Sequence, residues 1–171
     1  GLFLLFLLIV LPSESSKSEL LTGGLASPDT EFFYSADFLG DLVSEYSPEA
    51  REEYVISKIR FDILWPLVYG IWLTSGIGLI IKGIKRTGGL RKKSIMDRLP
   101  LLPLVAVVFD LLENIAVSTV MLTYPDAPMV ILGVAPIFTM LKWIALMGSI
   151  LIGAVLLLYY IIRILKRTPI D

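Results

Sequence analysis

The sequence predicts an all-α integral membrane protein, a four-helix bundle with an acidic, partly helical extracytoplasmic segment between its first two helices. Two observations support this expectation. Apolar residues make up 56% of the chain and the mean hydropathy is +0.79, whereas soluble domains are roughly 45–50% apolar. Three long apolar runs, Ile63–Ile81, Leu99–Thr123 and Pro136–Ile162, are each long enough to cross about 30 Å of hydrocarbon as a helix.

The composition also excludes several kinds of site. Because the chain has no Cys and no His, it cannot form disulfides, thiolate zinc sites or His-ligated haem. We therefore expect no cofactor and no metal site, and we expect no nucleic-acid partner. Gln is absent and Asn114 is the only Asn, a scarcity of heat-labile side chains that is typical of thermophilic prokaryotes.

A fourth apolar run, residues 1–12, opens the chain and is only about half a membrane span long. It is either a partial first membrane helix or the apolar part of a signal sequence. No small-residue cleavage site follows before Pro12 and the polar stretch SESSKSE. This absence favours a truncated first helix.

Residues 13–61 are predicted to form an extracytoplasmic linker followed by amphipathic helices. Gly and Pro interrupt the first part, which reads as a polar linker. Ser35 is placed to cap a helix whose apolar face includes Phe38, Leu42 and Tyr46. A second helix is expected to start at Ser47-Pro48-Glu49 and to continue directly into the next apolar run.

The distribution of charge predicts the orientation in the membrane. Residues 13–62 contain eleven acidic and four basic side chains, whereas residues 82–98 contain seven basic and one acidic, and three more cations follow Ile162. Because basic loops stay in the cytoplasm, the loop 82–98 and both termini are expected inside. The acidic segment and the turn 124–135 are then outside. We expect a multi-pass protein of the cell membrane, with residues 62–171 as a three-helix membrane core.

The stretch DLLENI, residues 110–115, places two carboxyls and the only Asn inside an apolar run. Asp110 and Asn114 share one helix face, and Glu113 lies within one turn of both. If the helix leaves the membrane near Tyr124, a rise of about 1.5 Å per residue places Glu113 near the bilayer midplane. Such groups have to face the bundle interior or a water-filled pocket, because exposure of a charge to lipid costs several kcal/mol.

Lys142 is the candidate counter-ion for these carboxyls, although its side chain could instead extend to the outer interface. Without a cation, at least one carboxyl is expected to be neutral and to form hydrogen bonds with Thr74, Ser75 or Tyr69. The candidate polar intramembrane centre therefore consists of Asp110, Glu113, Asn114, Lys142, Thr74 and Tyr69.

Small residues recur at four-residue spacing in two of the runs, at Gly70, Thr74 and Gly78 and again at Ala145, Ser149 and Gly153. Small residues allow membrane helices to approach closely. We therefore expect both rows to be helix-packing surfaces.

The stretches SPEAREEY, FDILWPLVYG, FDLLENI, YPDAP and FTMLKW resemble a pattern found in uncharacterised prokaryotic proteins with four membrane helices. In that pattern D-x-x-x-P-x-x-Y and D-x-x-E-N elements recur. The resemblance covers roughly residues 35–145, and it implies a fold and no activity. The matching positions add three residues on the outer face, Asp62, Arg51 and Tyr54, where a contact of Asp62 with Arg51 or Arg60 is expected to join the outer helix to the bundle.

Three functions are compatible with these patterns. The first is a non-enzymatic membrane subunit or scaffold whose polar centre is structural. The second is a transporter or an ion- or proton-binding protein that uses Asp110 and Glu113. The third is an intramembrane enzyme acting on lipid, with the same two carboxyls as general acid and base. The lipid bilayer is an expected partner in each case, together with other membrane subunits or further copies of the chain.

Overall fold

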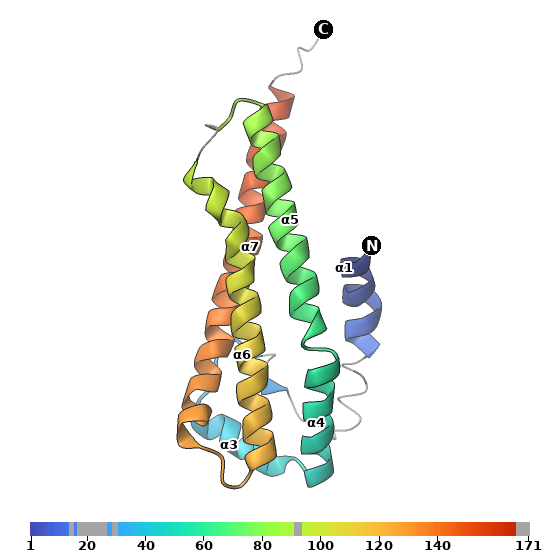
Figure 1. Ribbon diagram of the computed structural model, residues 1–171, viewed down its shortest axis with the longest axis vertical. Coiled ribbons are helices and arrows are strands. Elements are labelled where there is room, and N and C mark those ends of the chain that lie inside the picture. The colour runs from blue at the N-terminus through green and yellow to red at the C-terminus, as the bar shows by residue number, and fades with distance from the viewer. Residues whose placement is uncertain (14–15, 17–26, 29–30, 91–93, 167–171) are drawn as a thin grey trace.

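The computed structural model, which describes residues 1–13, 16, 27–28, 31–90 and 94–166, confirms the all-α class (Figure 1). No strand occurs among these residues, and most of the predicted linker lies outside them. By length and composition, three helical stretches can each cross a membrane. The chain is therefore a helical membrane protein. The elements are α1 (Leu2–Leu5), η1 (Phe6–Val10), α3 (Ala36–Glu45), α4 (Pro48–Arg60), α5 (Leu64–Arg86), η3 (Ile95–Leu101), α6 (Leu102–Thr123) and α7 (Met129–Leu165).

The three long helices α5, α6 and α7 pack side by side and form the core of the bundle (Figure 1). Tyr69 and Leu73 of α5 meet Ala106 and Val107 of α6 in one buried cluster. The short apolar N-terminal helix lies along α5, where the ring of Phe3 stacks on Trp72 with ring centroids 4.1 Å apart.

The helices α3 and α4 gather at one end of the bundle, and we call them the cap (Figure 1). Their starts were predicted correctly, because Ser35 accepts from the N–H of Phe38 and Ser47 accepts from the N–H of Ala50. The cap buries Leu39, Leu42, Val43 and Tyr46 from α3 and its end, and Ala50, Tyr54 and Val55 from α4, against Ala116, Val117, Val120 and Met121 of α6 and Ala135 of α7.

The opposite end of the bundle contains Lys85 and Arg86 in the last turn of α5, Arg98 in η3 and Arg163 in the last turn of α7, and we call it the basic end. Lys85 of α5 forms an ion pair with Asp97 of η3, with the nitrogen and oxygen 2.5 Å apart. Arg163 of α7 donates to the main-chain carbonyl of Thr87 across 3.0 Å. These contacts connect the end of α5 to η3 and to α7.

Two expected helix boundaries were wrong. The helix α4 does not continue into α5, because Phe61–Ile63 form a turn between them. The last helix begins at Met129 and not at Pro136, which is an interior residue of α7. Pro136 removes only one main-chain hydrogen bond, while the apolar residues before it, among them Ile131, Leu132 and Ala135, pack against the cap.

The rows of small residues lie where helices approach one another. A Cβ atom on Gly70 would stand 2.5 Å from Cγ2 of Val107 on α6, so α5 and α6 are in contact there. A Cβ on Gly153 would lie 3.6 Å from Cγ1 of Ile77, at ordinary contact distance between α7 and α5.

Candidate functional site: a polar network between the helices

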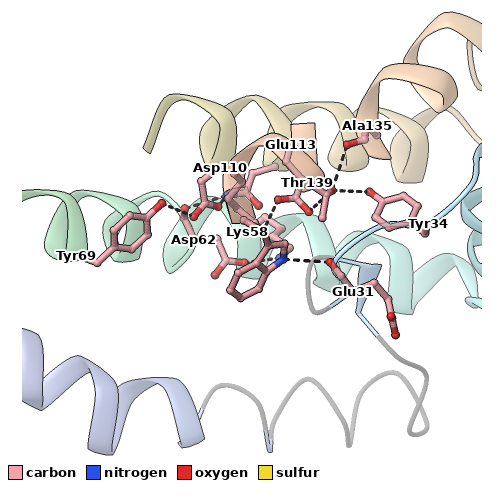
Figure 2. Close-up of polar contacts among 12 residues, drawn as sticks. Glu31, Tyr34, Lys58, Asp62, Tyr69, Asp110, Glu113, Ala135 and Thr139 are labelled. Carbon is pink, nitrogen blue, oxygen red and sulfur yellow. Dashed lines mark hydrogen bonds and ion pairs between the residues drawn. The ribbon is translucent and has the colours of Figure 1, made fainter. Parts of the chain in front are cut away.

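Asp110, Glu113 and Asn114 of α6 are all buried, with exposed fractions of 8%, 0% and 6%. They belong to a network of hydrogen bonds and ion pairs that joins α6 to α5, to α7 and to the chain before α3 (Figure 2). The network has two branches. Asp110 and Asn114 contact the start of α5, whereas Glu113 contacts α7.

In the first branch, the hydroxyl of Tyr69 donates to Oδ2 of Asp110 across 2.9 Å. Nδ2 of Asn114 donates to the main-chain carbonyl of Asp62 across 3.0 Å, and it lies 3.4 Å from Oδ1 of Asp110. The two elements quoted above, D-x-x-x-P-x-x-Y at 62–69 and D-x-x-E-N at 110–114, are therefore bonded to each other at two points.

The sequence explains why the carbonyl of Asp62 is open to Asn114. In an α-helix the N–H of residue i bonds to the carbonyl of residue i−4, and Pro66 has no N–H to offer to Asp62. A buried carbonyl without a partner costs free energy. The side chain of Asn114 supplies the missing donor from the neighbouring helix.

In the second branch, Nζ of Lys142 lies 2.5 Å from Oε2 of Glu113. Thr139, one turn earlier on α7, donates through Oγ1 to Oε1 of Glu113 across 2.7 Å. The hydroxyl oxygen of Tyr34 lies 3.2 Å from the same Oγ1, and the carbonyl of Ala135 lies 3.1 Å from it. Both oxygens of the Glu113 carboxyl are thus held by α7 (Figure 2).

The early start of α7 explains why Lys142 reaches Glu113. Counted from the turn between α6 and α7, Glu113 lies about 15 Å along α6 and Lys142 about 20 Å along α7. Helix side chains lean toward their own N-terminus. Glu113 therefore leans toward the basic end and Lys142 toward the cap, so the two side chains lean toward each other. If α7 began at Pro136, Lys142 would lie only about 9 Å from the turn, nearer to it than Glu113, and the two side chains would lean away from each other.

The residues predicted for the outer face separate in the structure. Asp62 forms an ion pair with Lys58 at 2.7 Å and not with Arg51 or Arg60. Arg51 donates to the carbonyls of Val43 and Tyr46 at the end of α3 and lies over the ring of Tyr124. Tyr54 is buried inside the cap. Asp62 joins the polar network through its carbonyl and through Lys58, whose Nζ also lies 5.0 Å from the ring centroid of Tyr54.

Thr74, a predicted member of the polar centre, does not join the network. Its Oγ1 is buried and has no hydrogen-bond partner among the residues that the structure describes. Ser75 faces outward on the same helix. The hydroxyl that serves the carboxyls belongs instead to Thr139.

Sequence reasoning missed four contributors, namely Tyr34, Lys58, Thr139 and Trp143. Thr139 and Trp143 flank Lys142 within one helical turn, and Lys58 precedes Asp62 by four residues, so helical spacing was an available signal for these three. Nε1 of Trp143 donates to the carbonyl of Glu31 across 3.1 Å. The segment Glu31–Ser35 is therefore tied to α7 by Trp143 and Thr139 (Figure 2).

The chain matches no protein-family model, no curated protein and no solved structure. The resemblance to prokaryotic four-helix membrane proteins therefore stays a prediction. Within the described ranges, no group of three or more Asp or Glu side chains is arranged to hold a metal ion. The arrangement can hold an ion pair and hydrogen bonds between helices.

Proposed function

We propose that the protein is a non-enzymatic membrane subunit or scaffold in which the polar network fixes the register of the helices. The main support is Glu113, which is fully buried and bonded through both oxygens to α7. Asp110 and Asn114 make the corresponding bonds to α5 and to the turn before it. A shift of any helix by one residue would separate these partners and leave buried polar groups unpaired, which is unfavourable.

We propose further that the cap faces outward and that the basic end faces the cytoplasm of a cell membrane, because basic segments stay inside. Tyr69 lies about 25 Å along α5 from Arg86, and Lys142 lies about 31 Å along α7 from Arg163. In a hydrocarbon layer about 30 Å thick that starts at the basic end, the network lies toward the outer surface. This replaces the midplane position that follows from counting inward from Tyr124.

Such a position favours a structural role, because a buried ion pair near the membrane surface loses less hydration than one at the centre. The charged helix α4 packs beside residues 116–121 of α6. In this arrangement the last turns of α6 and the first turns of α7 rise beyond the hydrocarbon together with the cap.

The test is infrared difference spectroscopy of the reconstituted protein while the external pH is stepped. Asp110→Asn and Glu113→Gln assign the carboxyl bands. A closed structural network predicts bands that do not change between about pH 3 and 9, a range that includes the ordinary pKa of exposed carboxyls. The spectrum of Glu52→Gln, a substitution at an exposed position of α4, is the control. Bands that follow external pH and respond to added cations would contradict the structural role.

A second candidate function, proton or cation binding, is favoured by one observation at Asp110. Its oxygens receive bonds only from the neutral groups of Tyr69 and Asn114, and no cation of the described chain lies within ion-pair distance of it. Lys142 is paired with Glu113, so Asp110 is the carboxyl of the centre that is the candidate for proton or cation exchange. On this alternative, Asp110→Asn abolishes a pH-driven proton flux into liposomes, whereas the structural role predicts equal, background flux for wild type and variant.

A further inference from the structure

The 3₁₀ helix η3 has an exposed face that carries one cation between two apolar side chains. Residues three apart lie above one another in a 3₁₀ helix, so Ile95, Arg98 and Leu101 form one face, and all three are exposed. Met96 and Leu99 form another face, which packs against the core cluster at the basic end. The face with Arg98 therefore points away from the bundle.

The remaining face of η3 contacts α5. Asp97 forms the ion pair with Lys85. One turn further along η3, Pro100 lies beside α5, since a Cβ atom on Gly78 would stand 4.0 Å from Cγ of its ring. The exposed faces of α5 and η3 therefore lie next to each other, on either side of this contact.

Three cations around this contact have no acidic partner within the described ranges. Lys82 and Arg86 share a face of α5 at four-residue spacing, and both are exposed, as is Arg98 of η3. Asp97 is the only acidic residue of segment 63–109, and it pairs with Lys85. We call Lys82, Arg86 and Arg98 the basic corner, because their positive charges are not neutralised by the chain itself.

Exposed apolar side chains lie beside the basic corner. Leu79 precedes Lys82 by three residues on α5 and is 68% exposed, while Ile95 and Leu101 on either side of Arg98 are 74% and 57% exposed. Apolar and basic side chains side by side on one exposed surface are typical of helices at the boundary between headgroups and lipid tails. A phospholipid whose tails cover these apolar side chains places its phosphate beside the cations.

We propose that the basic corner binds the phosphate group of an anionic phospholipid in the membrane leaflet at the basic end. Arg suits this ligand because its guanidinium can donate two parallel hydrogen bonds to a phosphate. Each Lys or Arg near an anionic leaflet contributes a factor of about five in affinity, the equivalent of about 1 kcal/mol.

Topology alone does not explain this arrangement. Basic residues are expected on the cytoplasmic side of any membrane protein, but that rule does not require them to share an exposed surface with apolar side chains. Nor does it require the one nearby carboxylate to pair with a fourth cation, Lys85. This inference goes beyond the proposed function, since it concerns the end of the bundle away from the polar network.

Thermal unfolding in a neutral detergent can test the proposal, because a ligand that binds only the folded protein raises its melting temperature. Short-chain phosphatidylglycerol, which has a net negative charge, and short-chain phosphatidylcholine, which has none, are titrated separately. For the wild type, we expect half-maximal stabilisation at a concentration of phosphatidylglycerol roughly tenfold lower than that of phosphatidylcholine, in line with the electrostatic contribution of several cations. Inorganic phosphate at the same concentrations should have little effect, since it lacks the tails.

The triple variant Lys82→Gln, Arg86→Gln, Arg98→Gln should lose the preference for phosphatidylglycerol. The double variant Arg86→Lys, Arg98→Lys retains the charges and should retain most of the preference. Arg60→Gln is the matched control, because it removes an exposed cation from the cap and should behave like the wild type. If the triple variant does not fold, Arg86→Gln and Arg98→Gln are measured singly, and each should weaken binding of phosphatidylglycerol about fivefold.

Equal stabilisation of the wild type by the two lipids would overturn the proposal, and so would an unchanged preference in the triple variant or in both single variants. Loss of the preference in Arg60→Gln would also overturn it, since the net charge of the protein would then decide. Stabilisation by inorganic phosphate as strong as that by phosphatidylglycerol would show a site for a free anion and not for a lipid. The infrared test of the polar network concerns other residues, so the two proposals can fail separately.

Discussion

The side-chain amide of Asn114 donates to the main-chain carbonyl of Asp62, the acceptor that the N–H of residue 66 would have by helical spacing if that residue were not Pro66. The donor comes from α6 and the acceptor is the carbonyl of Asp62, 3.0 Å away. One helix therefore completes the hydrogen bonding of another at the turn where α4 ends and α5 begins. The effect of replacing Asn114 on stability is therefore expected to depend on whether residue 66 is proline.

Asn114→Ala should lower the free energy of unfolding by about 1–3 kcal/mol, because the carbonyl of Asp62 loses its donor. In a Pro66→Ala background the same change should have a smaller effect, since the new main-chain N–H can bond to that carbonyl. Thermal unfolding of the four variants in detergent gives the coupling energy. Equal losses in both backgrounds would show that Asn114 acts in another way.

Replacing one partner of the Glu113–Lys142 pair should be strongly destabilising. Glu113→Gln or Lys142→Met each leaves a buried charge without its partner, at a cost of roughly 3–5 kcal/mol, and the double variant should recover much of the loss. The exposed pair Lys85–Asp97 is the control, and the same substitutions there should have little effect. Additive losses at Glu113 and Lys142 would contradict a direct interaction.

Thr139→Val keeps the shape of the side chain and removes the hydroxyl that donates to Glu113. We expect a loss of about 1–3 kcal/mol in unfolding free energy, because a buried carboxyl oxygen then lacks a donor. Thr123→Val is the matched control, since that hydroxyl is exposed and bonds only to the carbonyl of Thr119 within its own helix. The two variants should differ clearly in melting temperature. Similar melting temperatures would remove Thr139 from the network.

Gly70→Ala should destabilise the protein by about 1–3 kcal/mol, because the added methyl group overlaps Val107. Gly76→Ala has open space around the new atom and should be neutral or stabilising by up to about 1 kcal/mol, as Ala is the better helix former. Val107→Ala combined with Gly70→Ala should restore part of the loss. A neutral Gly70→Ala would place the contact between α5 and α6 elsewhere.

Hydropathy and capping rules were sufficient to predict the three long helices and the starts of α3 and α4, but not the break between α4 and α5 or the start of α7. Ser35, Ser47 and Pro48 start α3 and α4 where expected, because these residues act through local hydrogen bonds and backbone geometry. Pro136 was misleading for the same reason. Proline is common in the first turn of a helix, which predicts Pro136 as the start of the last helix. The packing of Ile131 and Leu132 against the cap keeps the residues before Pro136 helical as well.

The composition of the polar network was only partly predictable. Sequence spacing places Asp110 and Asn114 on one face, and it names Tyr69 and Lys142 as partners. Sequence spacing cannot show whether the hydroxyl of Thr74 or that of Thr139 bonds to the carboxyls, because this depends on the axial position of α7 relative to α6. Nor can it find Tyr34, which is more than a hundred positions from Thr139 in the chain and reaches it only after tertiary folding.

The contact between Asn114 and position 62 is made to the main chain, and every amino acid has the same carbonyl there. Divergence at position 62 therefore leaves this bond intact, while Asn114 and Pro66 have to change together. In distant relatives, replacements at Asn114 and at Pro66, about fifty residues apart, are then expected to occur together. A comparison of one position at a time would miss this correlation.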